Sequence, residues 1–319
     1  MFIDNKGDAM LGAQELKAIA DAKSSPPSEP SSNISSGLDS SLASHRLQDD
    51  SSVFVIHIST AVQKGEGAFA ARDIQKGDLI LSERPIFCLP ANVPEPLWRI
   101  YIEAEVRKLS PTDLDGYLSL QNSHNKCSPL PSPLAGIYDT NAFTASASDD
   151  EGGICLRASR FNHSCSPNAF YDFNSNTGEL QINALRNIPR GEEIFITYVS
   201  RRCVYGSPRQ LRQAILRSGY HFNCACSVCS LPEAESKMSD ARRQRLGELW
   251  ETIGRIYPTL EEGQCSNVVV KALREACVEG MRLLQEEGCC RLMIRDVEDF
   301  MSEAGPIRVS HPVCVPTSC

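Results

Sequence analysis

The sequence predicts an α+β fold in which short strands form small sheets and helices are added between and after them. Short apolar segments separated by Gly-containing turns occur over 53–82 and again over 169–199, as is typical of strands. Helical periodicity occurs over 94–121 and again after residue 229. Hydrophobic residues make up 41% and charged residues 23% of the 319 residues, so a normal globular core is expected.

The net charge restricts the classes of binding partner, and the cysteine content bears on the cellular compartment. A net charge of -8 argues against tight binding to nucleic acid or to anionic lipid, and is compatible with a basic, lysine-rich substrate. Residues 1–23 have no apolar segment typical of a secretory signal, and the apolar run 53–58 is too short to cross a bilayer. We therefore expect the nucleus or the cytoplasm, where the 14 cysteines stay reduced, and a monomer.

Each element follows in order from the N-terminus. Residues 1–52 are expected to be a disordered tail, because 24–52 contain twelve Ser, three Pro and no aromatic residue. Strands are expected at 53–58, 68–72 and 78–82.

The middle of the chain is expected to be a helical insert, at about 91–137, followed by a hairpin. Helices are predicted within 94–121, with Ser110 as an N-cap and Pro111 at the first helical position. Ser and Pro make 122–137 a predicted loop. Further strands are predicted at 169–173, 179–184 and 194–199, with a hairpin loop at 174–178, and amphipathic helices are predicted after 229.

One internal repeat is present. Residues 72–80 and 186–194 share the pattern R-[DN]-I-x-[KR]-G-[DE]-x-I, and each copy reads as a strand end, a turn and a strand. Two copies are too few for a solenoid. The repeat predicts two related β units packed together, although common turn chemistry could also produce it by coincidence.

The strongest local signal for a metal is the C-x-C-x-x-C of Cys224, Cys226 and Cys229. Three thiolates this close can occupy three corners of a zinc tetrahedron. Spacing alone does not choose a fourth ligand, for which Cys203, His221 and Cys165 are all candidates. Three reduced cysteines in a loop and a redox site are the alternatives.

Two further segments have a structural and a functional interpretation. Residues 160–168, with sequence RFNHSCSPN, are typical of an Asx or Ser turn, and two residues of separation do not make His163 and Cys165 a catalytic pair. An apolar strand ending at Tyr198 is usually a core strand with its phenol at the wet end. The Gly65-x-Gly67 pair lacks the third Gly and the strand–helix setting of a dinucleotide loop.

Taken in order, these segments resemble a SET domain over about 53–230. The shared landmarks are KGEGAFA at 64–70, TNAF at 140–143, the N-H-S-C-x-P-N within 160–168, GEEI leading to Thr197-Tyr198, and Y-x-F-x-C-x-C-x-x-C at 220–229. The similarity is to the SMYD-like and fungal SET branch. A MYND zinc finger is absent from the insert, where His124 and Cys127 are the only candidate ligands.

The resemblance implies a β-rich SET fold of small sheets with a pseudoknot. It implies a SET domain at 53–206, a post-SET zinc segment at 207–231 and a helical C-terminal region at 232–319. That last region is shorter than in SMYD proteins and is a candidate for truncation.

The resemblance also implies the activity, an S-adenosylmethionine-dependent protein-lysine N-methyltransferase that acts on a lysine ε-amine of a protein, for example a histone. A catalytically silent, zinc-bearing interaction module is the alternative. Tyr198 is implied at the point of methyl transfer, Tyr220 in the lysine channel, and Cys165 as the fourth ligand of a structural zinc with Cys224, Cys226 and Cys229. Lys64, Gly65, Glu66 and Gly67 are implied to line the cofactor, Asn141, Asn162 and His163 to hydrogen-bond it, and Phe222 to pack on its adenine.

Overall fold

A computed structural model describes residues 53–58, 65–90, 93–94, 97–125, 132–146, 151–261 and 267–288. The expected tail at 1–52, Lys64, Cys127 and the end of the chain after 288 lie outside the described residues. None of the helices in the described ranges is long and apolar enough to span a membrane.

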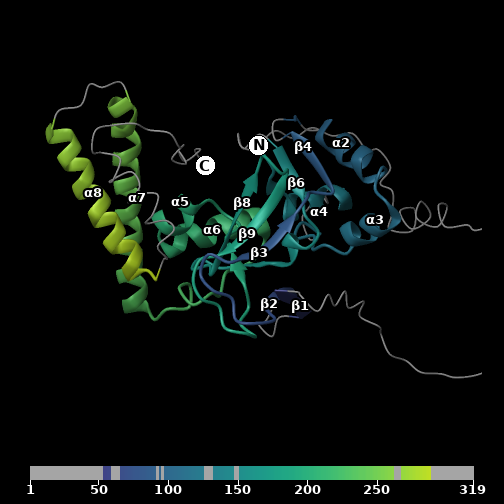
Figure 1. The fold of residues 1–319 in the computed structure, drawn as a ribbon, viewed down its shortest axis with the longest axis horizontal. Coiled ribbons are helices and arrows are strands. Elements are labelled where there is room, and N and C mark those ends of the chain that lie inside the picture. The colour runs from purple at the N-terminus through teal and green to yellow at the C-terminus, as the bar shows by residue number, and fades with distance from the viewer. Residues whose placement is uncertain are drawn as a thin grey trace, which may run out of the picture.

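The strands form small sheets at the centre of the molecule (Figure 1), as the predicted α+β class requires. β1 (Phe54–Ile58) pairs with β2 (Glu66–Ala70), and β10 (Phe195–Ile196) pairs in parallel with β7 (Asn162–His163). The two larger sheets have the orders β3-β9-β8 and β4-β6-β5. Their strands are β3 (Leu79–Glu83), β8 (Ala169–Asn174), β9 (Glu179–Ala184), β4 (Phe87–Pro90), β5 (Phe143–Thr144) and β6 (Glu151–Ile154).

Several strand boundaries differ from those predicted. The expected strand 68–72 lies at 66–70, because Gly67 is an extended residue of β2 and does not belong to the turn. The expected strand 194–199 is reduced to β10, because the chain leaves the ladder after Ile196 to bring Tyr198 against His163. The hairpin of β8 and β9 has the predicted bounds within one residue.

The two copies of the repeat, 72–80 and 186–194, pack directly against each other. Ile74 N donates to Ile188 O over 2.9 Å, and Ile188 N donates to Ile74 O over 2.9 Å. Both isoleucines are completely buried. The prediction that the copies are β units packed together is confirmed.

Side chains of each copy also form matching hydrogen bonds to the backbone of the other copy. Asp73 Oδ1 accepts a hydrogen bond from Arg190 N over 2.8 Å, and Asn187 Oδ1 accepts one from Lys76 N over 2.9 Å. Asp73 and Asn187 are equivalent in the repeat, as are Lys76 and Arg190. Each copy therefore fixes the turn of the other.

The glycine of each copy is required by its turn. Gly77 has a φ of +87° and Gly191 a φ of +84°, a left-handed backbone that glycine adopts without a steric penalty. Gly77 N donates to Ala184 O over 2.9 Å, and Gly191 N donates to Ala70 O over 2.8 Å. The four residues again form two equivalent pairs.

The insert packs helices against the β4-β6-β5 sheet at one end of the molecule (Figure 1). α2 (Leu97–Val106) and α3 (Pro111–Leu118) fall in the predicted helical region, and Ser110 accepts a hydrogen bond from Asp113 N as an N-cap. The loop predicted at 122–137 is partly wrong, because α4 (Pro133–Asn141) begins within it. Proline at a first helical turn needs no hydrogen-bond partner for its nitrogen, so Pro133 begins this helix.

Helices form the other end of the molecule. α5 (Arg201–Gly206) and α6 (Arg209–Tyr220) lie between the sheets and the antiparallel pair of α7 (Glu233–Glu261) and α8 (Asn267–Glu286) (Figure 1). Of the predicted apolar stripes of α7 and α8, the buried members are Leu246, Leu249, Leu273, Cys277 and Leu284. Trp250, Ile253 and Met281 are half-buried, and the side chains of Ile256 and Val270 lie outside the description.

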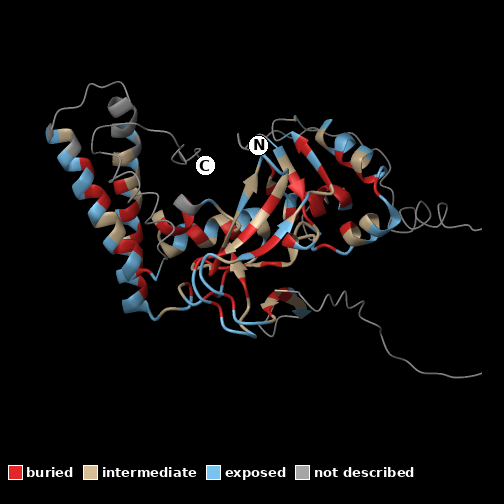
Figure 2. Ribbon diagram, viewed as in Figure 1, coloured by how far each residue is buried: buried red, intermediate tan, exposed pale blue. Residues whose placement is uncertain are grey.

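Buried side chains form three clusters rather than one (Figure 2). The first lies among β1, β2 and the β3-β9-β8 sheet, the second beneath the insert, and the third joins the cysteines to α6, α7 and α8. Tyr198 packs against the first cluster, whereas Tyr220 and Phe222 pack against the third. These three predicted site residues therefore lie where the two clusters meet.

Candidate functional site

The N-H-S-C motif is held by parallel pairing. Asn162 pairs with Phe195 and His163 with Ile196, and Ser164 N donates to Ile196 O over 2.9 Å. The pairing joins strands more than thirty residues apart in the sequence and fixes the register of the motif beside the segment that leads to Tyr198.

Asn162 connects three elements of the site. Its Nδ2 donates to Glu66 O over 3.0 Å and to Glu193 Oε1 over 2.7 Å. Both amide hydrogens are therefore engaged, which leaves Oδ1 as an acceptor. A Cβ on Gly67 would lie 2.6 Å from Glu193 Oε1 and 2.9 Å from Asn162 Nδ2, so a side chain here would displace the hydrogen bond between these two residues.

Glu193 and Asn168 are site residues that the sequence interpretation did not single out. Asn168 is 1% exposed, donates to Glu193 O over 2.9 Å, and accepts a hydrogen bond from Phe195 N over 2.7 Å. Both residues belong to motifs already quoted, Asn168 as the last letter of N-H-S-C-x-P-N and Glu193 in GEEI. Their positions in those motifs were the available signal.

The turn at 64–67 is described from Gly65 onward. Gly65 has a φ of +67°. Glu66 pairs with Arg160, whose Nη2 donates to Ser119 Oγ over 2.6 Å. This turn is thereby connected to both the motif and the insert, while Lys64 is outside the described residues.

His163 uses both of its ring nitrogens within the protein. Nδ1 accepts a hydrogen bond from Tyr198 N over 3.0 Å, and Nε2 lies 3.4 Å from Cys165 Sγ. Because Nδ1 is an acceptor, we assign the proton of the neutral ring to Nε2, which then donates to the sulfur. The imidazole therefore links the tyrosine loop to the cysteine cluster.

Tyr198, Tyr220 and Phe222 form an aromatic group around His163. The ring centroids of Tyr198 and Tyr220 are 5.1 Å apart, and those of Tyr198 and His163 are 5.3 Å apart. Phe222 lies 6.1 Å from His163 and 6.4 Å from Tyr198. The structure thus brings together the predicted catalytic, channel and adenine-packing side chains.

The two phenols are fixed by hydrogen bonds and remain neutral. Tyr198 Oη donates to Phe161 O over 2.9 Å, and Tyr220 Oη donates to Tyr198 O over 2.9 Å. Burial, with Tyr220 and Glu193 nearby, raises the pKa of Tyr198, and burial raises the pKa of Tyr220 to about 12. The Tyr198 oxygen is therefore an acceptor at neutral pH and not a base.

Asn141 ends α4 and is engaged within the insert. Its Nδ2 donates to Gln121 O and to Ile137 O, each over 2.7 Å. As at Asn162, only the amide oxygen remains to accept a hydrogen bond from a ligand. Both partners belong to the insert, so these two hydrogen bonds do not connect Asn141 to the aromatic group.

The structure gathers Cys165, Cys224, Cys226 and Cys229 into one buried cluster, with all four sulfurs within 4.8 Å of one another. Cys165 Sγ lies 3.6 Å from Cys229 Sγ and 4.0 Å from Cys224 Sγ. These distances are close to the roughly 3.8 Å expected for a tetrahedron with Zn–S bonds of about 2.3 Å. The donor set and its spacing fit zinc.

The cluster also selects among the candidate fourth ligands. Cys203 is buried but is not in the cluster, and His221 Nε2 lies 3.2 Å from His124 Nδ1 in the insert. Cys165 joins the three C-x-C-x-x-C cysteines because the parallel pairing of β7 places it against them.

Comparisons with known proteins agree on one family. Residues 65–199 match the family described as SET domain. Histone-lysine N-methyltransferase set5 of Schizosaccharomyces pombe is 31% identical over 194 residues, which covers 60% of this chain and 56% of the relative. Mouse protein-lysine N-trimethyltransferase SMYD5 is 42% identical over 98 residues, which covers 30% of this chain and 23% of the relative. The matched segments thus span less than two thirds of these relatives.

A solved structure of a related type gives only a weak match. The crystal structure of the Chaetomium thermophilum polycomb repressive complex 2 contains a chain that is 18% identical, covers 46% of this chain and 15% of that chain, and has a TM-score of 0.30. A likeness of this size carries no argument about the site.

Proposed function

Because this chain carries a SET domain and is related to the fungal Set5 and SMYD5 methyltransferases, we propose that it is a protein-lysine N-methyltransferase. The observation that carries the proposal is the aromatic group of Tyr198, Tyr220 and Phe222 against the N-H-S-C motif. The methyl donor implied by the family is S-adenosylmethionine, which supplies an electrophilic methyl group on a sulfonium.

The aromatic group suits the chemistry of a neutral lysine amine. Rings around the amine disfavour its charged form and fix its direction of approach. The Tyr198 hydroxyl hydrogen is directed to Phe161 O, so the Tyr198 oxygen has lone pairs available to orient the amine. Tyr198 is the proposed catalytic residue, and Tyr220 is proposed to line the channel while holding the Tyr198 backbone.

The cofactor-binding residues are proposed from their remaining hydrogen-bonding capacity. Asn162 and Asn141 each retain an amide oxygen, the atom that can accept from the ammonium group of the methionine portion. Phe222 offers a ring face for the adenine. The Lys64, Gly65, Glu66 and Gly67 turn is proposed to lie along the methionine portion, where a positive φ at Gly65 lets the backbone approach.

His163 receives a different role from the one expected. Both of its ring nitrogens already have partners in the protein, so we propose that the ring positions Tyr198 instead of binding the cofactor through its side chain.

A zinc ion bound by Cys165, Cys224, Cys226 and Cys229 is proposed as a structural element. Four protein thiolates leave no open position for a substrate or water, so such an ion would shape the site without entering the chemistry. It would hold the 220–229 segment, which carries Tyr220 and Phe222, against the SET domain.

The substrate is proposed to be a basic segment of a protein, with a histone as the first candidate. The net charge of -8 favours such a segment over nucleic acid. A relative is named a histone-lysine methyltransferase, and a nuclear location of this chain is proposed on the same basis.

Transfer of a labelled methyl group to core histones by the zinc-loaded full chain tests the proposal. Tyr198→Phe is expected to retain cofactor binding in calorimetry but to lower turnover at least tenfold, about 1.4 kcal/mol in the barrier, because the orienting oxygen is removed. Tyr101→Phe, at a 48% exposed tyrosine of α2, is the matched control and should leave turnover unchanged.

Two results would contradict the proposal. Equal turnover by Tyr198→Phe and the native chain would remove the role assigned to that oxygen. Absence of cofactor binding by a folded, zinc-loaded chain would instead favour a silent interaction module.

A further inference from the structure

Arg212 is a charged side chain in the interior that methyl transfer does not use. It lies on α6 and is 0% exposed, as is Leu216 one turn later. A buried guanidinium needs partners for its five N–H groups and for its charge, because removing an ion from water is costly. The groups around Arg212 must therefore supply both hydrogen-bond acceptors and negative charge.

Oxygen partners satisfy only part of this side chain. Arg212 Nη1 donates to Ser207 O and lies 3.6 Å from Asp240 Oδ1. That carboxylate oxygen also accepts a hydrogen bond from Arg209 N over 2.6 Å. Among the residues that the structure describes, Arg212 Nε and Nη2 have no hydrogen-bond partner.

The helix that carries Arg212 packs against the cysteine cluster, and Cys165 and Cys229 are neighbours of its guanidinium. The next residue of α6, Gln213, accepts a hydrogen bond from Cys224 N over 2.9 Å and donates one to Cys224 O. Leu216, one turn after Arg212, belongs to the same buried cluster as the four cysteines. The two unpartnered nitrogens of Arg212 therefore lie on a helix that is fixed against the sulfurs.

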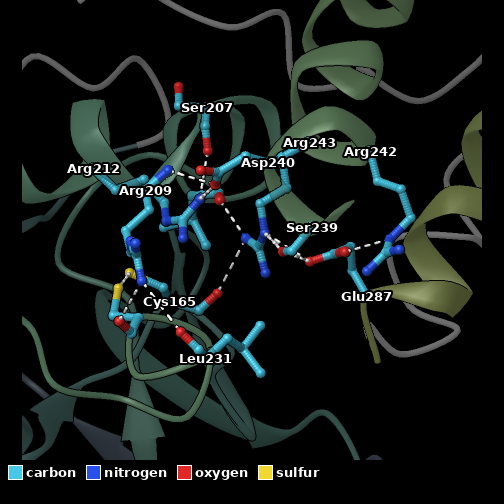
Figure 3. Close-up of polar contacts among 12 residues, drawn as sticks. Cys165, Ser207, Arg209, Arg212, Leu231, Ser239, Asp240, Arg242, Arg243 and Glu287 are labelled. Carbon is cyan, nitrogen blue, oxygen red and sulfur yellow. Dashed lines mark hydrogen bonds and ion pairs between the residues drawn. The ribbon is translucent and has the colours of Figure 1, made fainter. Parts of the chain in front are cut away.

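A second buried arginine near the cluster has a different partner. Arg243 donates to Cys165 O through Nη1, and its Nε donates to Glu287 Oε2 over 2.8 Å. Figure 3 shows Arg243 between Cys165 and Glu287, whereas Arg212 lies beside Asp240 and Ser207. The charge of Arg243 is thus balanced by Glu287, the residue that follows α8, and its hydrogen bond to the cluster is to the backbone oxygen of Cys165. Its Nη2 also has no hydrogen-bond partner among the described residues.

Charge balance gives Arg212 a purpose. Four thiolates around one Zn²⁺ carry a net charge of -2 in a buried place, and His163 brings a neutral donor to them. We propose that Arg212 is the counter-cation of the metal-loaded cysteine site and sets its affinity for zinc. This proposal does not depend on methyl transfer.

Zinc affinity of the full chain tests this assignment. Arg212→Met keeps an unbranched apolar stem but removes the guanidinium and its charge. Arg212→Lys keeps a charge with fewer donors, and Arg217→Met changes an exposed arginine on the same helix. Each zinc-loaded protein is titrated with a chromophoric chelator. Arg212→Met is expected to bind zinc about 10- to 100-fold more weakly, as is usual when an outer partner of a metal ligand is lost.

The other variants and one stability measurement distinguish loss of the Arg212 charge from loss of its packing contacts. Arg212→Lys is expected between the native chain and Arg212→Met, and Arg217→Met should match the native chain. Arg212→Met should lower the thermal midpoint of the zinc-loaded chain more than that of the metal-free chain. Should Arg212→Met not fold, the zinc affinity of Arg212→Lys relative to the native chain decides.

Three outcomes would overturn the assignment. The first is a zinc affinity of Arg212→Met within twofold of the native value. The second is a zinc affinity of Arg212→Lys as low as that of a folded Arg212→Met or, where Arg212→Met does not fold, equal to that of the native chain. The third is an equal fall of the thermal midpoint of Arg212→Met with and without zinc.

Discussion

The two copies of the repeat share one backbone arrangement, but only the second contributes a side chain to the site. Leu79 and Glu193 occupy the same position of the pattern, and each pairs across to an equivalent partner, Asn183 for Leu79 and Phe69 for Glu193. Leu79 is 47% exposed, whereas Glu193 accepts a hydrogen bond from Asn162.

The difference separates scaffold from function. Reciprocal contacts between Ile74 and Ile188, and between the two turns, need both copies to be alike. Two positions of the pattern differ without restriction between the copies, and at the later of them the second copy has a glutamate beside the N-H-S-C motif. The residues that the two copies share are therefore those that pack the copies together, and the difference between Leu79 and Glu193 concerns the site.

The largest expected effect concerns the shared core. Ile74→Ala and Ile188→Ala should each lower the free energy of unfolding by about 2–5 kcal/mol, because each removes a completely buried side chain. Urea unfolding of the zinc-loaded chain measures both. Similar losses would sharpen the equivalence of the copies, and a loss below about 1 kcal/mol in one of them would break it. Ile→Val at each site is the milder control.

An exchange of the position that differs should affect the two copies unequally. Glu193→Leu is expected to weaken cofactor binding roughly tenfold, about 1.4 kcal/mol, because Asn162 loses a charged hydrogen-bond partner. The reverse change in the first copy, Leu79→Glu, is at a half-exposed position and should alter stability by no more than about 0.5 kcal/mol and binding not at all.

Calorimetric titration of both variants with S-adenosylmethionine measures this asymmetry. Equal binding by Glu193→Leu and Leu79→Glu would contradict the site role given to Glu193.

The smallest expected effect concerns the reciprocal turn contacts. Asp73→Ala and Asn187→Ala each remove one exposed hydrogen bond to a backbone N–H, so each should cost about 1 kcal/mol of stability. Thermal unfolding should show two closely matched shifts. A shift in one variant alone would show that the turns are not held in the same way.

Local chemistry made much of the fold predictable. The glycine turn of each repeat copy, the Ser110 cap and the β8–β9 hairpin each depend on residues that are close in the sequence, and all three are present. α4 was missed because Pro133 was taken as a loop signal although proline is also favoured in a first helical turn.

The missing parts of the site depend on contacts between distant residues. Spacing alone left Cys203, His221 and Cys165 open as the fourth ligand, and only the resemblance singled out Cys165. The physical reason for that choice is the parallel pairing of β7 with β10, which no spacing reveals. α6 was not predicted because its buried face contains Arg212, and a charged residue interrupts the apolar pattern that indicates a helix. That charge is understandable only beside the cysteines.

The pairing of the two copies also sets when this protein can fold as it is made. The turn contacts join Lys76 to Asn187 and Asp73 to Arg190, partners 111 and 117 residues apart in the chain. At roughly 5–20 residues per second, a ribosome needs on the order of 5–20 s between the first partner and the second. During that interval the nascent first copy has an uncovered Ile74. We expect it to be a binding site for chaperones until the second copy emerges.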